Sequence, residues 1–240
     1  MVGMIFAAGL GTRLKPLTDT MPKALLPLAG KPLLQWQVEQ LREAGVSDII
    51  VNVHHFADMI IDTIRANDGW GCRIEVSDER DELLETGGGL RKAITGQGLQ
   101  GADEPILACN VDILSNIRIR ELVDRYARSG VSQLVVSERQ TQRYLCFDAT
   151  DRLCGWTNIA TGELKGHEGR HLAFSGMQIL SPEVLQQLQQ KPAGKFSLIA
   201  FYLDHMNDLP LQAFVPTDYR MMDVGKIDQL ADAERFAESL

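Results

Sequence analysis

The chain has 240 residues, of which 45% are hydrophobic, and its formal net charge is −8. This size and composition suit a single α/β domain with a sizeable core. A uniformly acidic protein binds nucleic acid poorly, so we expect no nucleic-acid partner, and an anionic ligand would need locally concentrated positive charge.

The first half of the sequence alternates between strand-like and helix-like segments. Apolar runs predict buried strands, and apolar residues at helical spacing predict the helices between them. The strands are expected at 2–7, 48–53, 72–76, 105–110 and 133–137, and the helices at 33–43, 56–65, 88–94 and 118–128, with Gly45 ending the first helix. This order predicts a three-layer α/β/α, Rossmann-like fold with a mainly parallel mixed sheet, whose strand ends form a ligand-binding edge.

The alternation changes after residue 137. Short strand-like pieces separated by polar turns predict a small antiparallel insertion, and a mixture of helices and strands follows it. The insertion strands are expected at 144–148, 153–156 and 172–180, the helices at 182–190, 197–206 and 226–239, and two further strands at 211–215 and 219–222. No linker or repeat interrupts the chain, so residues 1–240 are expected to form one domain.

A glycine turn follows the first strand, in the sequence Ala7-Ala8-Gly9-Leu10-Gly11-Thr12-Arg13. Glycines allow a ligand to approach the backbone, and consecutive amides in such a turn bind anions. Arg13 and Lys23 add positive charge, while Pro16 and Pro22 stiffen the segment. A plain turn between strand and helix would explain the glycines alone, but the whole combination favours a nucleoside triphosphate site.

Two commoner phosphate-binding loops do not fit this segment. The dinucleotide fingerprint requires a third glycine where the chain has Leu14. The P-loop requires Gly-Lys-Ser/Thr, whereas Gly30-Lys31 is followed by Pro32.

Two aspartates, Asp112 and Asp223, each follow a strand-like run, at the edge where ligands are expected. Two carboxylates can share a magnesium ion, which completes its coordination with water and phosphate oxygens. The alternative is that each aspartate caps a helix, and this is stronger for Asp223 because Lys226 is expected to open one.

The remaining sequence signals bear on zinc and on the cellular compartment. The four cysteines are scattered without a CxxC pair, so no zinc site is expected, and Cys109 and Cys146 are predicted to be buried thiols. No apolar run is long enough to predict a membrane span, and no signal-peptide pattern is present. We therefore expect a cytoplasmic protein with no membrane partner.

The segments Gly9–Thr18, Pro22–Pro27 and Gly30–Leu33 resemble the signature of the sugar-1-phosphate nucleotidyltransferases. The resemblance extends over the chain, with matching pieces near Gly87, Asp112, Gly176 and Asp223, and implies a GT-A-like nucleotidyltransferase fold. The short chain and the stretch Glu85-Thr86-Gly87-Gly88-Gly89 are most similar to N-acetylmuramate-1-phosphate uridylyltransferases, with mannose-1-phosphate guanylyltransferase-like proteins close behind.

The resemblance implies transfer of a nucleoside monophosphate, with UTP expected as the donor, to a sugar 1-phosphate such as N-acetylmuramate 1-phosphate in cell-wall recycling. Its implied catalytic residues are Arg13 for the β- and γ-phosphates, Lys23 for the α-phosphate and the acceptor, and Asp112 and Asp223 for Mg²⁺. It also implies a nucleotide-binding half at about 1–137 and a sugar-phosphate half at about 138–240.

The resemblance further implies the contacts to the substrates. Nucleotide-binding residues are expected to be Ala7, Ala8, Gly9, Gly11, Thr12, Arg13, Lys23, Gly87, Gly88 and Asn110, and Glu79 or Glu85 is a candidate to accept the imide proton of uracil. Sugar-binding residues are expected to be Asn158, Ser175 and Gly176. The chain departs from the family at Gly155–Asn158, where many relatives have Glu-Lys-Pro, and at Tyr144-Leu145, where Tyr-Gly is common. Trp156 is predicted either to stack on the sugar or to lie in the core.

Three alternative functions remain open on the sequence. They are a mannose-1-phosphate guanylyltransferase, a cytidylyltransferase with another alcohol phosphate as acceptor, and a regulatory protein that binds nucleotide sugars without catalysis. The four catalytic positions are all filled, which favours an enzyme. The chain is compatible with a monomer or a homo-oligomer.

Overall fold

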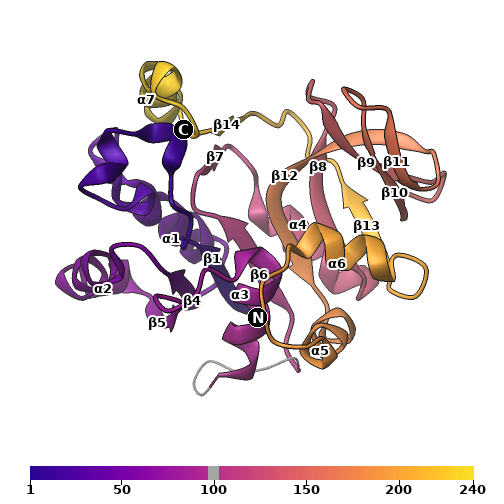
Figure 1. The fold of residues 1–240 in the computed structure, drawn as a ribbon, viewed down its shortest axis with the longest axis horizontal. Helices are drawn as coiled ribbons and strands as arrows, with labels where there is room; N and C mark the ends of the chain where they lie inside the picture. Colours follow the sequence, from indigo (N-terminus) through magenta and orange to yellow (C-terminus); the bar gives the residue numbers. More distant parts are fainter. Residues whose placement is uncertain (97–102) are drawn as a thin grey trace.

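A ten-stranded sheet organises the computed structural model, which describes residues 1–96 and 103–240 (Figure 1). Its main path runs β11-β10-β9-β12-β6-β1-β4-β5, while β8 pairs with β12 off this path and β13 pairs with β8. The predicted fold class, a mixed α/β architecture with a parallel central part and a small antiparallel part, is confirmed.

The parallel part lies at the centre of the nucleotide half that the sequence predicts. Here β1 (Val2–Phe6) pairs with β4 (Asp48–Val53) and β6 (Ile106–Asn110), and β5 (Arg73–Asp78) pairs with β4. All four strands run in the same direction, so their carboxyl ends meet at one edge. Ligands of open α/β sheets bind at such an edge.

The strand β12 (Arg170–Leu180) joins the parallel and antiparallel parts. Its end, Met177–Leu180, pairs antiparallel with β6, and its start, Arg170–Leu172, pairs with β9. The neighbouring strands are β8 (Ser132–Ser137), β9 (Arg143–Phe147), β10 (Leu153–Asn158), β11 (Glu163–Gly166) and β13 (Leu211–Phe214). The antiparallel insertion is therefore continuous with the central sheet.

Helices cover both faces of the sheet, and each face has its own apolar core. Along β1, Ile5 points to one core, whereas Met4 and Phe6 point to the other. One face is covered by α1 (Leu33–Glu43), α2 (Ala57–Ala66), α4 (Ile119–Ser129) and α7 (Leu230–Glu238). The opposite face is covered by α3 (Glu85–Thr95), α5 (Pro182–Gln190) and α6 (Leu198–His205).

Short elements that sequence patterns do not predict shape the ligand-binding edge. They include β2 (Pro27–Leu28), β3 (Lys31–Pro32), β7 (Ile113–Ser115) and 3₁₀ helices at Thr12–Leu14, Leu17–Asp19, Lys23–Leu25 and Ile227–Gln229. One more unpredicted 3₁₀ helix, Asp68–Gly71, precedes β5 and so lies at the opposite edge of the sheet. Each is too short to carry a hydrophobic period.

The strand β14 (Met221–Asp223) pairs antiparallel with β7 and places Asp223 opposite Ile113. The helix expected at 226–239 instead opens with the 3₁₀ turn, and α7 begins at Leu230. Asp223 therefore ends a strand and does not cap a helix.

The other boundaries agree closely with the predicted ones. Gly45, at φ 90°, ends α1, and α5 covers the predicted range 182–190. Among the other elements, α3 begins at residue 85 rather than 88, β5 continues to residue 78, β10 continues to residue 158 and β12 begins at residue 170. The exposed strand β11 was not predicted. Within the described residues, no helix is both long and apolar enough to span a membrane.

Candidate active site

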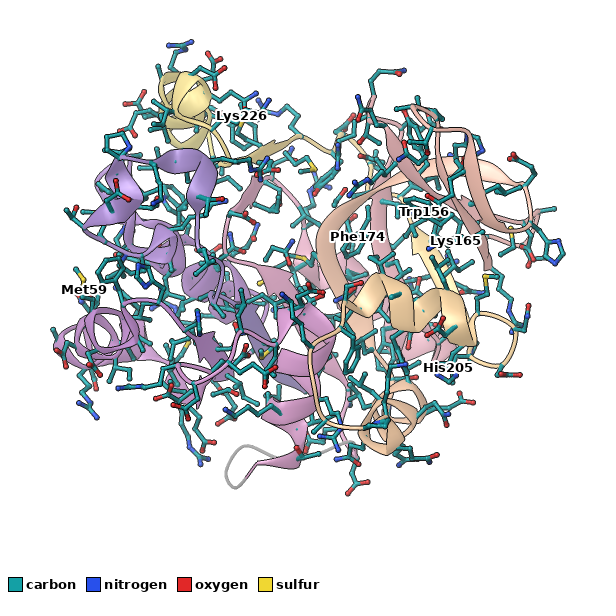
Figure 2. The ribbon with its side chains drawn as sticks, viewed as in Figure 1. Met59, Trp156, Lys165, Phe174, His205 and Lys226 are labelled. Carbon is teal, nitrogen blue, oxygen red and sulfur yellow. The ribbon has the colours of Figure 1, made fainter. Side chains whose placement is uncertain are left out.

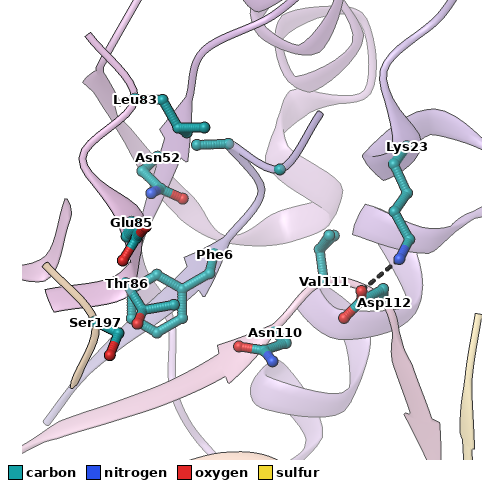
Figure 3. A pocket seen from close by; sticks show the side chains of 12 residues that line it. Phe6, Lys23, Asn52, Leu83, Glu85, Thr86, Asn110, Val111, Asp112 and Ser197 are labelled. Carbon is teal, nitrogen blue, oxygen red and sulfur yellow. Dashed lines mark hydrogen bonds and ion pairs between the residues drawn. The ribbon is translucent and has the colours of Figure 1, made fainter. Parts of the chain in front are cut away.

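A cavity of about 380 Å³ opens at the carboxyl ends of β1, β4 and β6 (Figure 3). Glu85, Thr86 and Ser197 lie on one side of it, and Lys23 and Asp112 lie on the other. The lining comprises Phe6, Ala8, Gly9, Lys23, Asn52, Leu83, Glu85, Thr86, Asn110, Val111, Asp112 and Ser197. The sheet edge predicted to bind ligand is thus hollowed, and several of the predicted nucleotide contacts line it.

The glycine turn after β1 has a fixed shape. Gly11 adopts a left-handed conformation with φ 62°, and its carbonyl accepts hydrogen bonds from Thr18 Oγ1 at 2.9 Å and Leu14 N at 2.8 Å. A Cβ on Gly11 would lie 2.9 Å from Thr18 Cγ2, so this position is confined to glycine. Thr12 and Arg13 follow in an exposed 3₁₀ turn.

Lys23 and Asp112 form an ion pair between the predicted phosphate loop, residues 7–23, and the residues that follow β6. The lysine is only 7% exposed, whereas the Asp112 side chain is 24% exposed and faces the cavity. Burial of an ammonium requires a partner of opposite charge. Asp112 supplies that partner and also leaves its carboxylate at the cavity wall.

Asp223 lies next to this pair. Val224 N donates a hydrogen bond of 2.9 Å to Asp112 O, which fixes the two segments against each other. Desolvation raises the pKa of Asp223, and the negative charge of Asp112 raises it further, while Lys23, Arg13 and Arg139 oppose the shift. The two aspartates therefore share one electrostatic environment.

Arg13 and Asp223 both lie beside Gly225. A Cβ at Gly225 would lie 2.9 Å from Asp223 Oδ1 and 3.1 Å from Arg13 Nη2. The four residues predicted to be catalytic come from three distant parts of the chain and lie near one another. Lys23 and Asp112 line the end of the cavity, whereas Arg13 and Asp223 lie beside that pair and are not among the lining residues.

A buried hydrogen-bond relay, which the sequence analysis missed, links the phosphate loop to α3. Ala7 N donates to Asn52 Oδ1 at 2.7 Å, and Asn52 Nδ2 donates to Glu79 Oε1 at 2.7 Å. Leu84 N completes the relay by donating to Glu79 Oε2 at 3.2 Å. The only sequence signal was an asparagine inside the apolar run at 48–53.

Glu79 is therefore a structural residue. It is 1% exposed, and burial raises its pKa, partly offset by the hydrogen bond from Asn52. Of the two candidates for the imide proton of uracil, only Glu85 lines the cavity.

The glycines at the start of α3 pack against the protein itself. The N–H groups of Gly87 and Gly88 both donate to Phe196 O, at 2.9 and 3.1 Å. A Cβ on Gly87 would overlap the Phe196 ring, and one on Gly88 would overlap Gly194 O. These two N–H groups already have an acceptor, and the cavity is lined by their neighbours Glu85 and Thr86.

A second cavity of about 470 Å³ adjoins the first and shares Ser197 with it. It lies between the antiparallel strands and α6. Its lining comprises Arg139, Thr141, Arg143, Tyr144, Leu145, Trp156, Lys165, Phe174, Ser197, Ile199, Ala200 and Leu203. Trp156 lines this cavity and also packs against the core cluster on that face, while its stacking on a sugar stays a prediction.

The three predicted sugar-binding residues are not among those lining the second cavity. Asn158 Oδ1 accepts a hydrogen bond from Ala160 N at 3.1 Å, and Ser175 is 1% exposed. Gly176, at φ 74°, packs against Asn110, because a Cβ there would lie 3.0 Å from Asn110 Nδ2. Gly176 thus supports an asparagine that lines the first cavity.

The cysteines behave largely as the sequence predicts. Cys109 and Cys146 are buried, and burial raises their pKa to about 12 and about 11. Both remain thiols at neutral pH. Cys146 lies near Glu168 and His171, with one ligand atom of each within 4.8 Å of the others.

Comparison with known proteins identifies the family. The model of the nucleotidyl transferase family matches residues 2–239. The chain belongs to the nucleotidyl transferase family. Among relatives of this nucleotidyl transferase, N-acetylmuramate alpha-1-phosphate uridylyltransferase from Neisseria meningitidis is 41% identical over 242 residues, covering 99% of this chain and 98% of the relative.

Two further comparisons extend this finding. Mannose-1-phosphate guanyltransferase from Debaryomyces hansenii is 31% identical over 200 residues, which are 81% of the present nucleotidyl transferase and 53% of that enzyme. The crystal structure of HddC from Yersinia pseudotuberculosis, complexed with GMP-PN, is 26% identical with a TM-score of 0.75, covering 98% of this chain and 99% of HddC. The homologues are thus sugar-1-phosphate nucleotidyltransferases.

Proposed function

We propose that this nucleotidyl transferase moves UMP from UTP to N-acetylmuramate 1-phosphate and releases pyrophosphate. The observation that carries the proposal is the convergence of Arg13 and Asp223 on the Lys23–Asp112 pair at one end of the first cavity. The near full-length similarity to the Neisseria uridylyltransferase supports UTP and N-acetylmuramate 1-phosphate as the substrates.

The proposed reaction needs alignment and charge neutralisation more than proton transfer. An oxygen of the acceptor phosphate attacks the α-phosphorus, and the bond to the β-phosphate oxygen breaks, with its electron pair leaving on pyrophosphate. The nucleophile is already an anion, so no general base is required. Arg13 would bind the β- and γ-phosphates, and Lys23 would lie between the α-phosphate and the acceptor phosphate, which reduces their repulsion.

We propose that Asp112 and Asp223 hold Mg²⁺. The two carboxylates offer only oxygen ligands, which suit this ion, and the raised pKa of Asp223 reflects in part a repulsion that a cation would relieve. Bound there, the ion would supply Lewis-acid stabilisation of charge on the α-phosphate. Lys23 holds one oxygen of Asp112 and so orients this carboxylate.

The base is proposed to lie on the opposite side of the first cavity. Leu83 and Thr86 would contact its ring, and the Glu85 carboxylate would accept a hydrogen bond from the imide N–H of uracil. Gly87 and Gly88 would support this wall indirectly, by allowing α3 to pack against the segment at 194–196. Ala8, Gly9 and Asn110 remain proposed contacts to the nucleotide, because they line the space between the two sides.

The sugar is proposed to occupy the second cavity, where Trp156 and Phe174 offer aromatic surface. The division into a nucleotide half at 1–137 and a sugar half at 138–240 fits this arrangement, although Ser197 and Asp223 from the second half also serve the nucleotide end. We further propose a cytoplasmic location, where UTP is available.

The test is pyrophosphate release by the purified protein with each of the four nucleoside triphosphates. Each is combined with N-acetylmuramate 1-phosphate, mannose 1-phosphate and phosphocholine. We expect turnover to be greatest with UTP and N-acetylmuramate 1-phosphate, and to stop when EDTA is added. Absence of turnover with every pair would support the regulatory alternative.

Guanylyl transfer to mannose 1-phosphate is the second candidate, because the Debaryomyces enzyme matches four-fifths of the chain. Greatest turnover with GTP and mannose 1-phosphate would replace our proposal with this one. Greatest turnover with CTP and phosphocholine would favour the cytidylyltransferase alternative.

A further inference from the structure

The second cavity concentrates positive charge in an acidic protein. Its described lining includes Arg139, Arg143 and Lys165 but no aspartate or glutamate, while the whole chain has a net charge of −8. Three cations in a concave wall raise the local concentration of anions. The composition of this wall therefore points to an anionic ligand.

Two of these cations have no acidic partner among the residues that the structure describes. Arg143 makes no side-chain hydrogen bond or ion pair with any residue in 1–96 or 103–240. Arg139 donates a hydrogen bond of 3.0 Å to Phe174 O and, within the same ranges, forms no ion pair. Lys165 has only a loose, exposed ion pair, with its Nζ 3.6 Å from Glu163 Oε1.

Strand pairing places Arg143 and Lys165 on the face of the antiparallel strands that carries Trp156. Lys165 is the cross-strand partner of Trp156, and Arg143 is the partner of Asn158, two residues further along β10. Cross-strand partners project to the same face, as do residues two apart on a strand. Lys165 Nζ lies 5.6 Å from the centre of the Trp156 ring, and Figure 2 shows both close to Phe174 and α6.

The third cation is nearer to the reaction centre. Arg139 follows β8 and donates a hydrogen bond to Phe174 O, and Gly176, two residues further along β12, packs against Asn110 of the first cavity. It is therefore placed to serve the 1-phosphate of the acceptor, as Lys23 is. The positive charges of Arg143 and Lys165 are more than one phosphate at the reaction centre requires, so they are available to bind a second anionic group.

We propose, resting on the function proposed above, that the second cavity selects a sugar 1-phosphate with a carboxylate on a ring substituent, which Arg143 and Lys165 bind. Trp156 and Phe174 would contact the ring, and Arg143 and Lys165, on the face that carries Trp156, would hold the carboxylate beside it. Charge-assisted hydrogen bonds to guanidinium and ammonium groups give this recognition its strength. N-acetylmuramate has such a group in its lactyl ether, and N-acetylglucosamine has a hydroxyl in its place.

The experiment compares N-acetylmuramate 1-phosphate with N-acetylglucosamine 1-phosphate, using UTP as the donor. The ratio of their kcat/KM values is measured for the wild type, Arg143→Gln and Lys165→Gln. We expect the wild type to prefer the carboxylated acceptor by at least about 100-fold, and each variant to lower this ratio by about 10- to 100-fold, as loss of a charged hydrogen bond predicts. Arg128→Gln, which removes an exposed charge from α4, is the matched control and should leave the ratio unchanged.

Binding of the products UDP-N-acetylmuramate and UDP-N-acetylglucosamine, measured by calorimetry, gives a second readout without turnover. The variants should lose affinity mainly for the carboxylated product. Equal use of both acceptors by the wild type, or an unchanged ratio in both variants, overturns the carboxylate site while leaving nucleotidyl transfer intact. No turnover with any acceptor would instead overturn the proposed function on which the site rests.

Discussion

The two aspartates of the candidate site differ in what else they do. Asp112 neutralises the buried ammonium of Lys23, whereas Asp223 forms no ion pair with any residue that the structure describes. The pKa of Asp223 is raised by desolvation and by Asp112, so its ionised form is disfavoured in the folded protein. Substitution of either aspartate should therefore lower activity, but only substitution of Asp112 should also lower the stability of the fold.

Asp223→Asn should lower kcat by at least about 100-fold, because it removes one of the two proposed ligands of the metal ion. It should not lower the free energy of unfolding. A carboxyl with a raised pKa in the folded state costs stability once it ionises, so a neutral amide is favoured at pH 7. Turnover by pyrophosphate release and unfolding in urea measure the two effects, and near-normal turnover would remove Asp223 from the mechanism.

Asp112→Asn should lower turnover similarly and also destabilise the fold, by about 1–3 kcal/mol, because Lys23 loses its charged partner. The double variant Lys23→Met with Asp112→Asn should recover part of this stability, since no buried charge is left unpaired. Urea unfolding of the two single variants and the double variant provides the test. Strict additivity of the two changes would contradict the coupling inferred from the structure.

At the scale of elements, α3 shows how a glycine run can serve packing. A Cβ on Gly88 would overlap the carbonyl oxygen of Gly194, so α3 and the segment at 194–196 approach as closely as they do only with glycine there. This contact closes one side of the first cavity, which Thr86 and Ser197 line. The relay through Asn52 and Glu79 fixes the start of the same helix to β1 and β4.

Gly88→Ala should destabilise the protein by about 1–3 kcal/mol, the usual cost of overpacking, although alanine favours a helix interior by up to about 1 kcal/mol. Gly96→Ala is the matched control, because a Cβ there would meet its nearest atom, Lys92 O, at 3.5 Å. Urea denaturation of both variants measures the difference. A Gly88→Ala variant as stable as the control would show that the two segments separate easily.

At the scale of the whole molecule, the two cavities depend on elements from both ends of the chain. β14 must pair with β7 to bring Asp223 beside Asp112, and α6 must cover β9 and β10 to close the second cavity. β12 couples the two parts, since it pairs with β6 at one end and with β9 at the other. Ligand binding to this arrangement should therefore stabilise the fold as a unit.

UTP with MgCl₂ should raise the melting temperature by about 5–10 °C at a ligand concentration of roughly 100 times Kd. This estimate combines about 2.7 kcal/mol of linkage stabilisation with about 2–4 °C per kcal/mol for a protein of this size. EDTA or Asp223→Asn should remove most of the shift, as measured by differential scanning calorimetry. An equal shift with EDTA present would show that UTP binds without the metal ion.

Much of the fold and part of the site could be predicted from local patterns. Apolar runs separated by helical periods identify β1, β4, β6 and the helices between them, because burial on both faces of a parallel sheet imposes that pattern. The glycine turn, Arg13 and Lys23 lie within one short stretch of sequence, so a phosphate site could be predicted there without a structure. β14 was predicted, at 219–222, but its partner β7 was not, because three residues are too few to establish a hydrophobic period.

The sequence by itself determined the α/β class and the family to which the chain belongs, and it identified the glycine turn as a predicted phosphate site, since each depends on residues near one another along the chain. Only the tertiary structure decided that Glu79 is buried, that Gly87 and Gly88 pack against residue 196, and that Arg143 and Lys165 share a face with Trp156. The glycines of α3 and residue 196 are more than a hundred residues apart, and Arg143, Trp156 and Lys165 lie on three different strands. Their contact depends on strand register and helix packing, which no local pattern encodes.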